Sequence, residues 1–106
     1  MPKYLVEFSY SVEGAKGLIK EGGTARRAAT EKAVQSMGGK LEAYYFAFGE
    51  TDGFGLVDMP DNVSVAAINL AIGASGAVRT KTTVLITPEE VDAAVKKSPA
   101  YRPPGQ

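Results

Sequence analysis

The sequence contains no cysteine and no histidine. Without cysteine it cannot form disulfides, offer a thiolate nucleophile or hold an iron–sulfur cluster. Without histidine it lacks the commonest metal ligand, the usual axial ligand of haem and the usual general base near neutral pH. These two absences exclude much catalytic chemistry, and we expect no metal and no cofactor.

An excess of charge and a long apolar run are lacking too. Lys and Arg together number 12 and Asp and Glu together number 12, so no net field attracts nucleic acid or an anionic membrane. No stretch approaches the roughly 18 apolar residues that a membrane span needs, and Glu7 interrupts the apolar run near the N-terminus. The sequence therefore predicts a cytoplasmic protein with no nucleic-acid partner and no membrane association.

What is present fits a single α+β domain. Alternating aromatic and branched residues predict strands, and runs of helix formers after capping residues predict helices. The expected strands span residues 3–10, 40–48, 54–59 and 78–87, and the expected helices span residues 24–37, 62–75 and 88–97, with a helical turn at 14–20. We assign residues 1–97 to one domain and residues 98–106, which hold three prolines, to an extended tail.

The order β-α-β-β-α-β is that of the split βαβ arrangement. It predicts a ferredoxin-like fold, in which an antiparallel sheet carries two helices on one face. A short C-terminal helix should follow, because a proline at Pro88 and the two acidic residues after it are typical of a helix start.

The second predicted strand is apolar on both faces, with alternating positions at Tyr44, Phe46 and Phe48 on one side and Leu41, Ala43, Tyr45 and Ala47 on the other. An antiparallel sheet with one solvated face shows polar residues on that face. We therefore expect the face without helices to pack against the sheet of a second subunit, forming a dimeric α+β barrel. The alternative is that the last helix and the tail cover this face.

The second long helix provides a further sign of assembly. No charged side chain occurs from Asn62 to Val78, although a surface helix normally has a charged outer stripe. We expect a second subunit contact there, and thus a homodimer or a higher even homo-oligomer. The alternative is an ordinary alanine-rich helix that the last helix partly hides.

Two charged residues near strand ends are candidates for a ligand site. Asp52 lies in the predicted hairpin turn, where an aspartate commonly hydrogen-bonds its own turn, and contact with a ligand is the functional reading. Arg79 begins the last strand, where a guanidinium can hold a carboxylate or a phosphate. The alternative for Arg79 is an ion pair with Asp52 or Glu50.

A second candidate site follows Gly22 and Gly23. Thr24, Arg26 and Arg27 lie at the predicted start of a helix, where free backbone N–H groups can bind an anion. The chain has neither a phosphate-loop pattern nor a full dinucleotide fingerprint, so a plain helix cap with solvated arginines is the alternative.

Aromatic residues indicate a third candidate site. Such side chains usually build a core, but a barrel between two sheets could retain an apolar cavity into which Glu7, Tyr10 and Tyr45 project. A carboxylate buried there could act as a general base, because burial raises its pKa. Glu7, Asp58 or a tyrosine would then be the reactive group.

Several segments together resemble the GYD-domain family: Gly38–Leu41, Gly49–Asp52, Met59–Asn62, the alanine-rich helix that follows, and Gly76–Thr80. The resemblance implies a small bacterial or archaeal protein whose fold is related to dimeric α+β barrels and whose biochemical role is undefined. We expect a bacterial protein. Thr51 stands where the Gly-Tyr-Asp turn of the family has its tyrosine, so the resemblance carries over no role for a phenol at that turn.

Three classes of function fit these features. The first is an oligomeric module that binds, or is regulated by, a small apolar or anionic molecule. The second is a cofactor-free oxygenase or isomerase that uses an apolar cavity with a carboxylate or a tyrosine, and the third is a structural assembly protein. The sequence leaves the choice between enzyme and binding module open and identifies no ligand.

Overall fold

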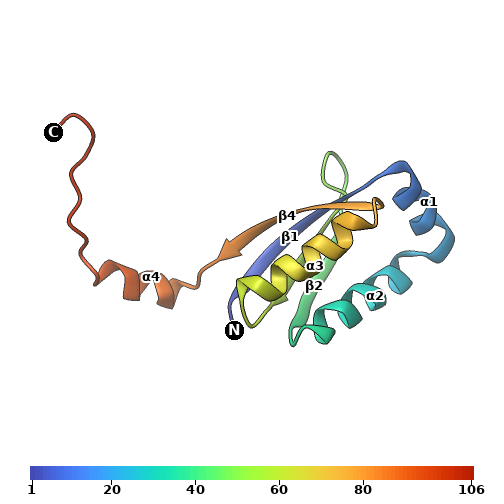
Figure 1. The fold of residues 1–106 in the computed structure, drawn as a ribbon, viewed down its shortest axis with the longest axis horizontal. Coiled ribbons are helices and arrows are strands. Elements are labelled where there is room, and N and C mark those ends of the chain that lie inside the picture. The colour runs from blue at the N-terminus through green and yellow to red at the C-terminus, as the bar shows by residue number, and fades with distance from the viewer.

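The computed structural model describes all 106 residues and shows an α+β fold. Figure 1 shows α2 and α3 on one face of the sheet, α1 near one end, and α4 well away from the body. The elements in chain order are β1 (Lys3–Tyr10), α1 (Val12–Glu21), α2 (Gly23–Ser36), β2 (Lys40–Phe46), β3 (Gly53–Asp58), α3 (Asn62–Ala74), β4 (Val78–Leu85) and α4 (Pro88–Val95). The α+β class expected from the sequence is confirmed, and no helix is long and apolar enough to cross a membrane.

The sheet is antiparallel throughout, in the order β2-β3-β1-β4. β3 lies between β1 and β2 and so splits the first strand–helix–strand unit. The arrangement differs from a simple β-α-β-β-α-β chain, because α1 and α2 both occupy the first connection and α4 follows β4. α1 is a ten-residue helix rather than a short turn, and the Ser11 side chain caps it by accepting a hydrogen bond from the Gly14 N–H.

The core lies between the sheet and helices α2 and α3. Its most buried members are Tyr4, Val34, Val57, Met59 and Val65. The Tyr4 hydroxyl donates a hydrogen bond to Asn62 Oδ1 at 2.6 Å, which satisfies the polar atom of an otherwise apolar cluster. These residues pack closely at the end of the sheet where β1 begins.

The residue pattern of β2 differs from the expected alternation. A bulge between Leu41 and Ala43 shifts its register against β3, because the extra residue has no partner there. Leu41 therefore lies on the helix-covered face with Tyr44 and packs against the core, and its expected place on the opposite face is wrong. β2 also ends at Phe46, whereas Phe48 lies beyond it and is fully exposed.

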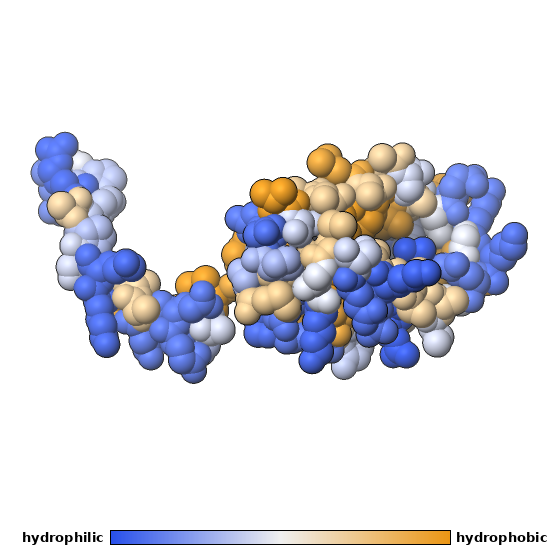
Figure 2. Space-filling model, turned by 60° about the horizontal axis from the view of Figure 1, so that its bottom comes forward, coloured by the Kyte–Doolittle hydropathy of each residue, from blue (hydrophilic) through white to orange (hydrophobic).

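The other face of the sheet carries no helix, and we call it the open face. Its apolar side chains include Leu5, Ala43, Phe54 and Leu56, with Leu85 at the end of β4. Every residue from Pro88 to Gln106 is exposed, and Figure 2 shows this segment standing away from the body. The alternatives in which the last helix covers the open face or hides α3 are therefore wrong.

Candidate functional site

An apolar cavity of about 70 Å³ lies between α2 and α3, above the centre of the sheet. Val6, Gly55 and Val57 form its floor, with Val34 of α2 and Ile68 of α3 on its sides. At roughly 30 Å³ for each water molecule in the liquid, this volume corresponds to about two waters. We call it the α2–α3 cavity.

The cavity exists partly because β3 has no side chain at its centre, where Gly55 lies. Gly55 pairs with Val6 on one side and with Tyr44 on the other, so it faces the two helices. A Cβ at Gly55 would lie 3.7 Å from Tyr44 Cδ1 and 3.9 Å from Leu41 Cδ1, both ordinary van der Waals distances. The fold thus has room for a methyl group that the sequence omits.

Aromatic rings form a rigid wall at one end of the cavity. The Phe8 ring stacks on Tyr44 with centroids 5.0 Å apart, and it meets Tyr10 edge-on at 5.8 Å. Phe46 packs edge-on against Tyr44 at 5.5 Å. Gly53 makes this wall possible, since a Cβ there would come within 2.2 Å of Phe8 Cζ. Such interlocked rings hold their positions with little freedom.

A few polar side chains also line the cavity. They are Tyr10, Arg26, Thr30, Tyr44, Asn69 and Thr80. Asn69 is already engaged, since its Nδ2 donates to Thr82 Oγ1 at 2.9 Å. An apolar chamber with a few polar groups in its lining is the usual form of a small-molecule site.

Tyr10 is a hydrogen-bond donor in this site rather than a base. Burial raises the pKa of its phenol well above the ordinary value, and Tyr44 beside it adds to the rise. The hydroxyl therefore remains protonated at neutral pH. It can donate to an acceptor on a bound molecule, but it cannot remove a proton from one.

Arg26 supplies the positive charge near Tyr10. Its Nη1 lies 3.6 Å from Glu21 Oε1, and both side chains are partly exposed. An ion pair of this length at the surface contributes little, so an anionic group in the cavity can replace Glu21 at small cost. The Arg26 side chain also lowers the pKa of Tyr10 slightly, against the larger effects that raise it.

No carboxylate lines the α2–α3 cavity. The chain also has no group of three or more Asp and Glu residues placed to hold a metal ion. Within the cavity, acid–base chemistry would depend on the tyrosines alone.

The sheet separates the residues expected to form one ligand site. Tyr10 faces the α2–α3 cavity, whereas Glu7, Tyr45 and Arg79 lie on the open face. Glu7 Oε1 accepts a hydrogen bond from Thr51 Oγ1 at 3.3 Å, and Tyr45 is 71% exposed. The cavity found in the chain is therefore on the opposite side of the sheet from Glu7.

Asp52 holds the end of β1 in place. Its Oδ2 accepts a hydrogen bond from the Tyr10 N–H at 2.7 Å, and its own N–H donates to the Phe8 carbonyl at 2.9 Å. The carboxylate thus ties the β2–β3 loop to a neighbouring strand instead of capping its own turn. It fixes the backbone of Tyr10 and positions that side chain in the cavity.

Arg79 is exposed and forms no ion pair in the chain. The expected pair with Asp52 or Glu50 is therefore wrong, because Asp52 is turned toward the Tyr10 backbone. Arg79 borders a shallow polar depression with Glu7 and Lys81 on the open face.

The three residues of the expected anion site point in different directions. α2 begins at Gly23 with Gly22 as its cap, and no side chain caps its free N–H groups. Arg26 turns into the α2–α3 cavity, Arg27 lies on the outer side of α2 near Tyr45, and Thr24 is exposed. Of the three, only Arg26 takes part in the cavity.

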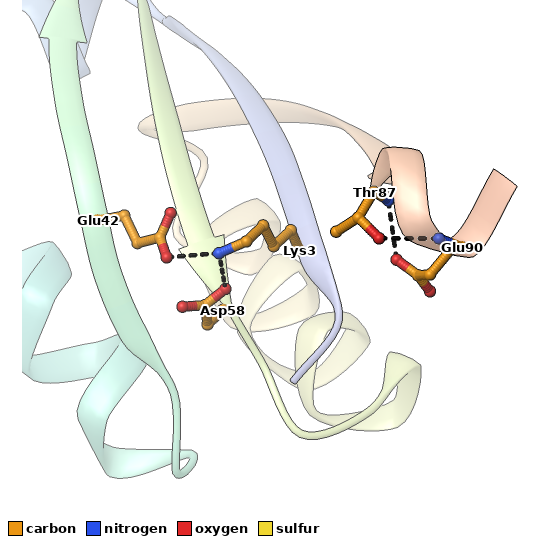
Figure 3. Close-up of polar contacts among 5 residues, drawn as sticks. All are labelled: Lys3, Glu42, Asp58, Thr87 and Glu90. Carbon is orange, nitrogen blue, oxygen red and sulfur yellow. Dashed lines mark hydrogen bonds and ion pairs between the residues drawn. The ribbon is translucent and has the colours of Figure 1, made fainter. Parts of the chain in front are cut away.

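An ion cluster occupies one end of the open face, as Figure 3 shows. Lys3 Nζ lies 2.7 Å from Asp58 Oδ1 and 2.5 Å from Glu42 Oε1. Its hydrogen bonds to Asp58 and Glu42 raise the pKa of Lys3, and the bond from Lys3 lowers the pKa of Asp58. Asp58 is thus held ionised by its partner, which is the opposite of what a general base with a raised pKa requires.

The residues that α3 and β3 bring to the cavity were not among the site residues expected from the sequence. Gly55, Ile68, Asn69 and Ile72 all line it. Ile68 and Ile72 follow the helical spacing expected for a face that packs on the sheet, but that spacing is the same for a filled core and for a hollow one. The glycine at position 55 was the available signal, since a strand interior seldom omits a side chain without a reason.

Comparison with known families supports the resemblance seen in the sequence. The pattern of the GYD domain matches residues 4–95, from β1 to the end of α4. No curated protein and no solved structure matches the chain. Because the match covers most of its length, the chain belongs to the GYD domain family.

Proposed function

We propose that this GYD domain is an oligomeric small-molecule binding module, and that its ligand occupies the α2–α3 cavity. The cavity itself carries the proposal: it is apolar, and Tyr10 and Arg26 place a hydroxyl and a positive charge in its lining. The cytoplasmic location and bacterial origin expected from the sequence belong to this proposal as well.

The chemistry of the cavity defines the class of ligand. Its floor and sides favour a flat apolar group, while Tyr10 offers a hydroxyl and Arg26 a positive charge. A single-ring aromatic molecule with one anionic or hydrogen-bond-accepting substituent matches both parts. The ring would lie over Gly55, with its substituent toward Tyr10 and Arg26.

Binding is favoured over acid–base catalysis for a specific reason. The carboxylates considered as bases, Glu7 and Asp58, lie across the sheet from the cavity, and Tyr10 stays protonated because its pKa is raised. The groups that contact the ligand would therefore hold and orient it without exchanging protons.

We also propose that two copies pack through their open faces as a dimeric α+β barrel with ferredoxin-like subunits. Leu5, Phe54 and Leu56 at the centre of this face are only partly buried in the single chain. Two sheets packed face to face would remove them from water. Each copy would keep its own α2–α3 cavity, since the helices lie on the outside of such a barrel.

The test uses benzoate as the probe and compares matched glycine variants. Saturation-transfer NMR measures benzoate binding to the wild type, to Gly55→Ala and to Gly73→Ala. A methyl at Gly55 enters the cavity without a clash, whereas a methyl at Gly73 on α3 meets open space. Ile72→Phe, at the cavity wall, is the stronger block.

We expect benzoate to bind the wild type and Gly73→Ala alike. Binding to Ile72→Phe should weaken by at least about tenfold, which corresponds to roughly 1.4 kcal/mol, and Gly55→Ala should fall between. Equal binding by all four proteins would place benzoate elsewhere and overturn the assignment of the cavity. Absence of binding to the wild type would overturn the ligand class.

A further inference from the structure

α4 is a well-defined helix with nothing to pack against in its own chain. No hydrogen bond or ion pair joins it to the domain, and Figure 1 shows it clear of the sheet and the other helices. Val91 and Val95, one turn apart on the same side, are 44% and 74% exposed. We call the segment from Ile86 to Val95 the arm.

The sequence nevertheless specifies a helix here. Thr87 Oγ1 accepts from the Glu90 N–H at 3.1 Å, and Glu90 Oε1 accepts from the Thr87 N–H at 2.8 Å, as Figure 3 shows. Pro88 fits the first turn, and Glu89 and Glu90 suit its positive end. An eight-residue helix is marginal in water on its own, so these signals imply that the arm is stabilised by docking.

The link between β4 and α4 disfavours docking within the chain. Only Ile86 and Thr87 separate the two elements. Because Thr87 precedes Pro88, it is confined to extended backbone, and it is observed at φ −78° and ψ 160°. The chain can therefore turn only at Ile86, and the arm points away from the domain that carries it.

The matching surface is the outer face of α3. Val63 and Leu70, two turns apart on that face, are 78% and 73% exposed. Neither α3 nor the residues up to Val78 contribute a charged side chain, so covering this face desolvates no ion. The open face, by contrast, carries charges on all four strands, among them Lys3, Glu7, Lys40, Asp58 and Lys81.

We propose that the arm of one copy docks on the outer face of α3 in a second copy, with Val91 and Val95 packed between Val63 and Leu70. Under two-fold symmetry the exchange is reciprocal, which doubles the apolar area buried by one short helix. The contact lies on the helix side of the chain, so it is independent of both the open-face dimer and the α2–α3 cavity.

The absence of cysteine from the chain allows a direct test. Val95→Cys and Leu70→Cys are made as separate variants, one of them isotopically labelled, and are mixed and oxidised gently. Intact mass then reports the mixed disulfide, which can form only between two copies. The control pairs Val95→Cys with Lys32→Cys, an exposed position on α2.

We expect the mixed disulfide of Val95→Cys and Leu70→Cys to form about a hundredfold faster than the control pair, because docking raises the local thiol concentration from micromolar toward millimolar. Equal rates for the two pairs would overturn the proposal. So would a disulfide that forms within a Val95→Cys/Leu70→Cys double variant while the mixed single variants stay unlinked, since that result means docking within one chain. All these positions are exposed in the single chain, and unchanged circular dichroism verifies that each variant folds.

Discussion

At the scale of single residues, Asp52 and Tyr10 form the most informative pair. Asp52 could have been a ligand-binding residue, but its carboxylate accepts from the Tyr10 backbone N–H at 2.7 Å. Asp52 would therefore affect a bound molecule only indirectly, by holding Tyr10 in position. The two roles predict different behaviour when the side chain is replaced.

Asp52→Ala should lower the free energy of unfolding by about 1 to 3 kcal/mol, because it leaves the Tyr10 N–H without its partner in a half-buried place. Asp52→Asn keeps an acceptor oxygen at the same position and should lose much less. Urea unfolding monitored by circular dichroism gives both values. An equal loss for the two variants would mean that the carboxylate charge, rather than the hydrogen bond, stabilises the loop.

The phenol of Tyr10 should lose its proton at a higher pH than an ordinary tyrosine does. Burial raises the pKa of its phenol above the value of 10.0 in an unfolded chain, so the folded state binds this proton more tightly. The stability contributed by the proton is fully present below pH 10 and declines as the pH rises above it. Phenolate absorbance of the folded protein should show a delayed component that Tyr10→Phe removes and that urea abolishes. A delayed component that survives in Tyr10→Phe would contradict this assignment.

At the scale of elements, the sequence predicted those ends of helices and strands that are marked by particular residue types. β1 spans Lys3–Tyr10 as expected, and α3 begins at Asn62, as the helix predicted over residues 62–75 does, with Asp61 as its cap. The bulge beside Leu41 was not predictable, because alternation along β2 does not show where an unpaired residue lies. The cavity was not predictable either, since Ile68 and Ile72 look alike in a filled and in a hollow core.

The cap of α3 should be sensitive to acid. Asp61 Oδ1 accepts from the Ser64 N–H at 2.8 Å, and this backbone hydrogen bond lowers the pKa of Asp61 below 3.8. The stabilisation is therefore present above pH 3.8 and is lost as the pH falls through the lower, folded value. Asp61→Ser keeps a cap without a charge, so its stability should change less over this acid range. A parallel acid dependence in both proteins would show that other carboxylates dominate it.

At the scale of the whole molecule, the fold exposes three apolar surfaces that one chain cannot cover: the open face, the outer face of α3 and the arm. The first was predicted from the two apolar faces of β2, although the bulge moves Leu41 away from it. What the sequence could not show is that α4 would leave its own domain. Its capping signals fix its structure, whereas its direction depends on the two-residue link of Ile86 and Thr87.

The open face should determine the first step of assembly. β2 and β4 are the edges of the sheet, so a two-fold axis along the strands would place β4 of one copy over β2 of the other. Lys81 on β4 is level with Glu7, Phe54 and Tyr45 across the sheet, so it would then face Tyr45 of the partner subunit while the leucines of the two centres meet. Such a contact combines an apolar centre with a polar rim.

Leu56→Asp puts a charge at the centre of this contact and should lower the subunit number, since an unpaired carboxylate between two sheets is costly to desolvate. Val12→Asp, at an exposed position on α1, is the matched control and should leave the assembly unchanged. Native mass spectrometry of the three proteins measures the subunit number directly and also detects any retained small molecule. A wild type that is monomeric at all concentrations would refute the sheet-to-sheet contact. If Leu56→Asp instead keeps the subunit number of the wild type, the contact that holds the oligomer together would be the one between the arm and α3.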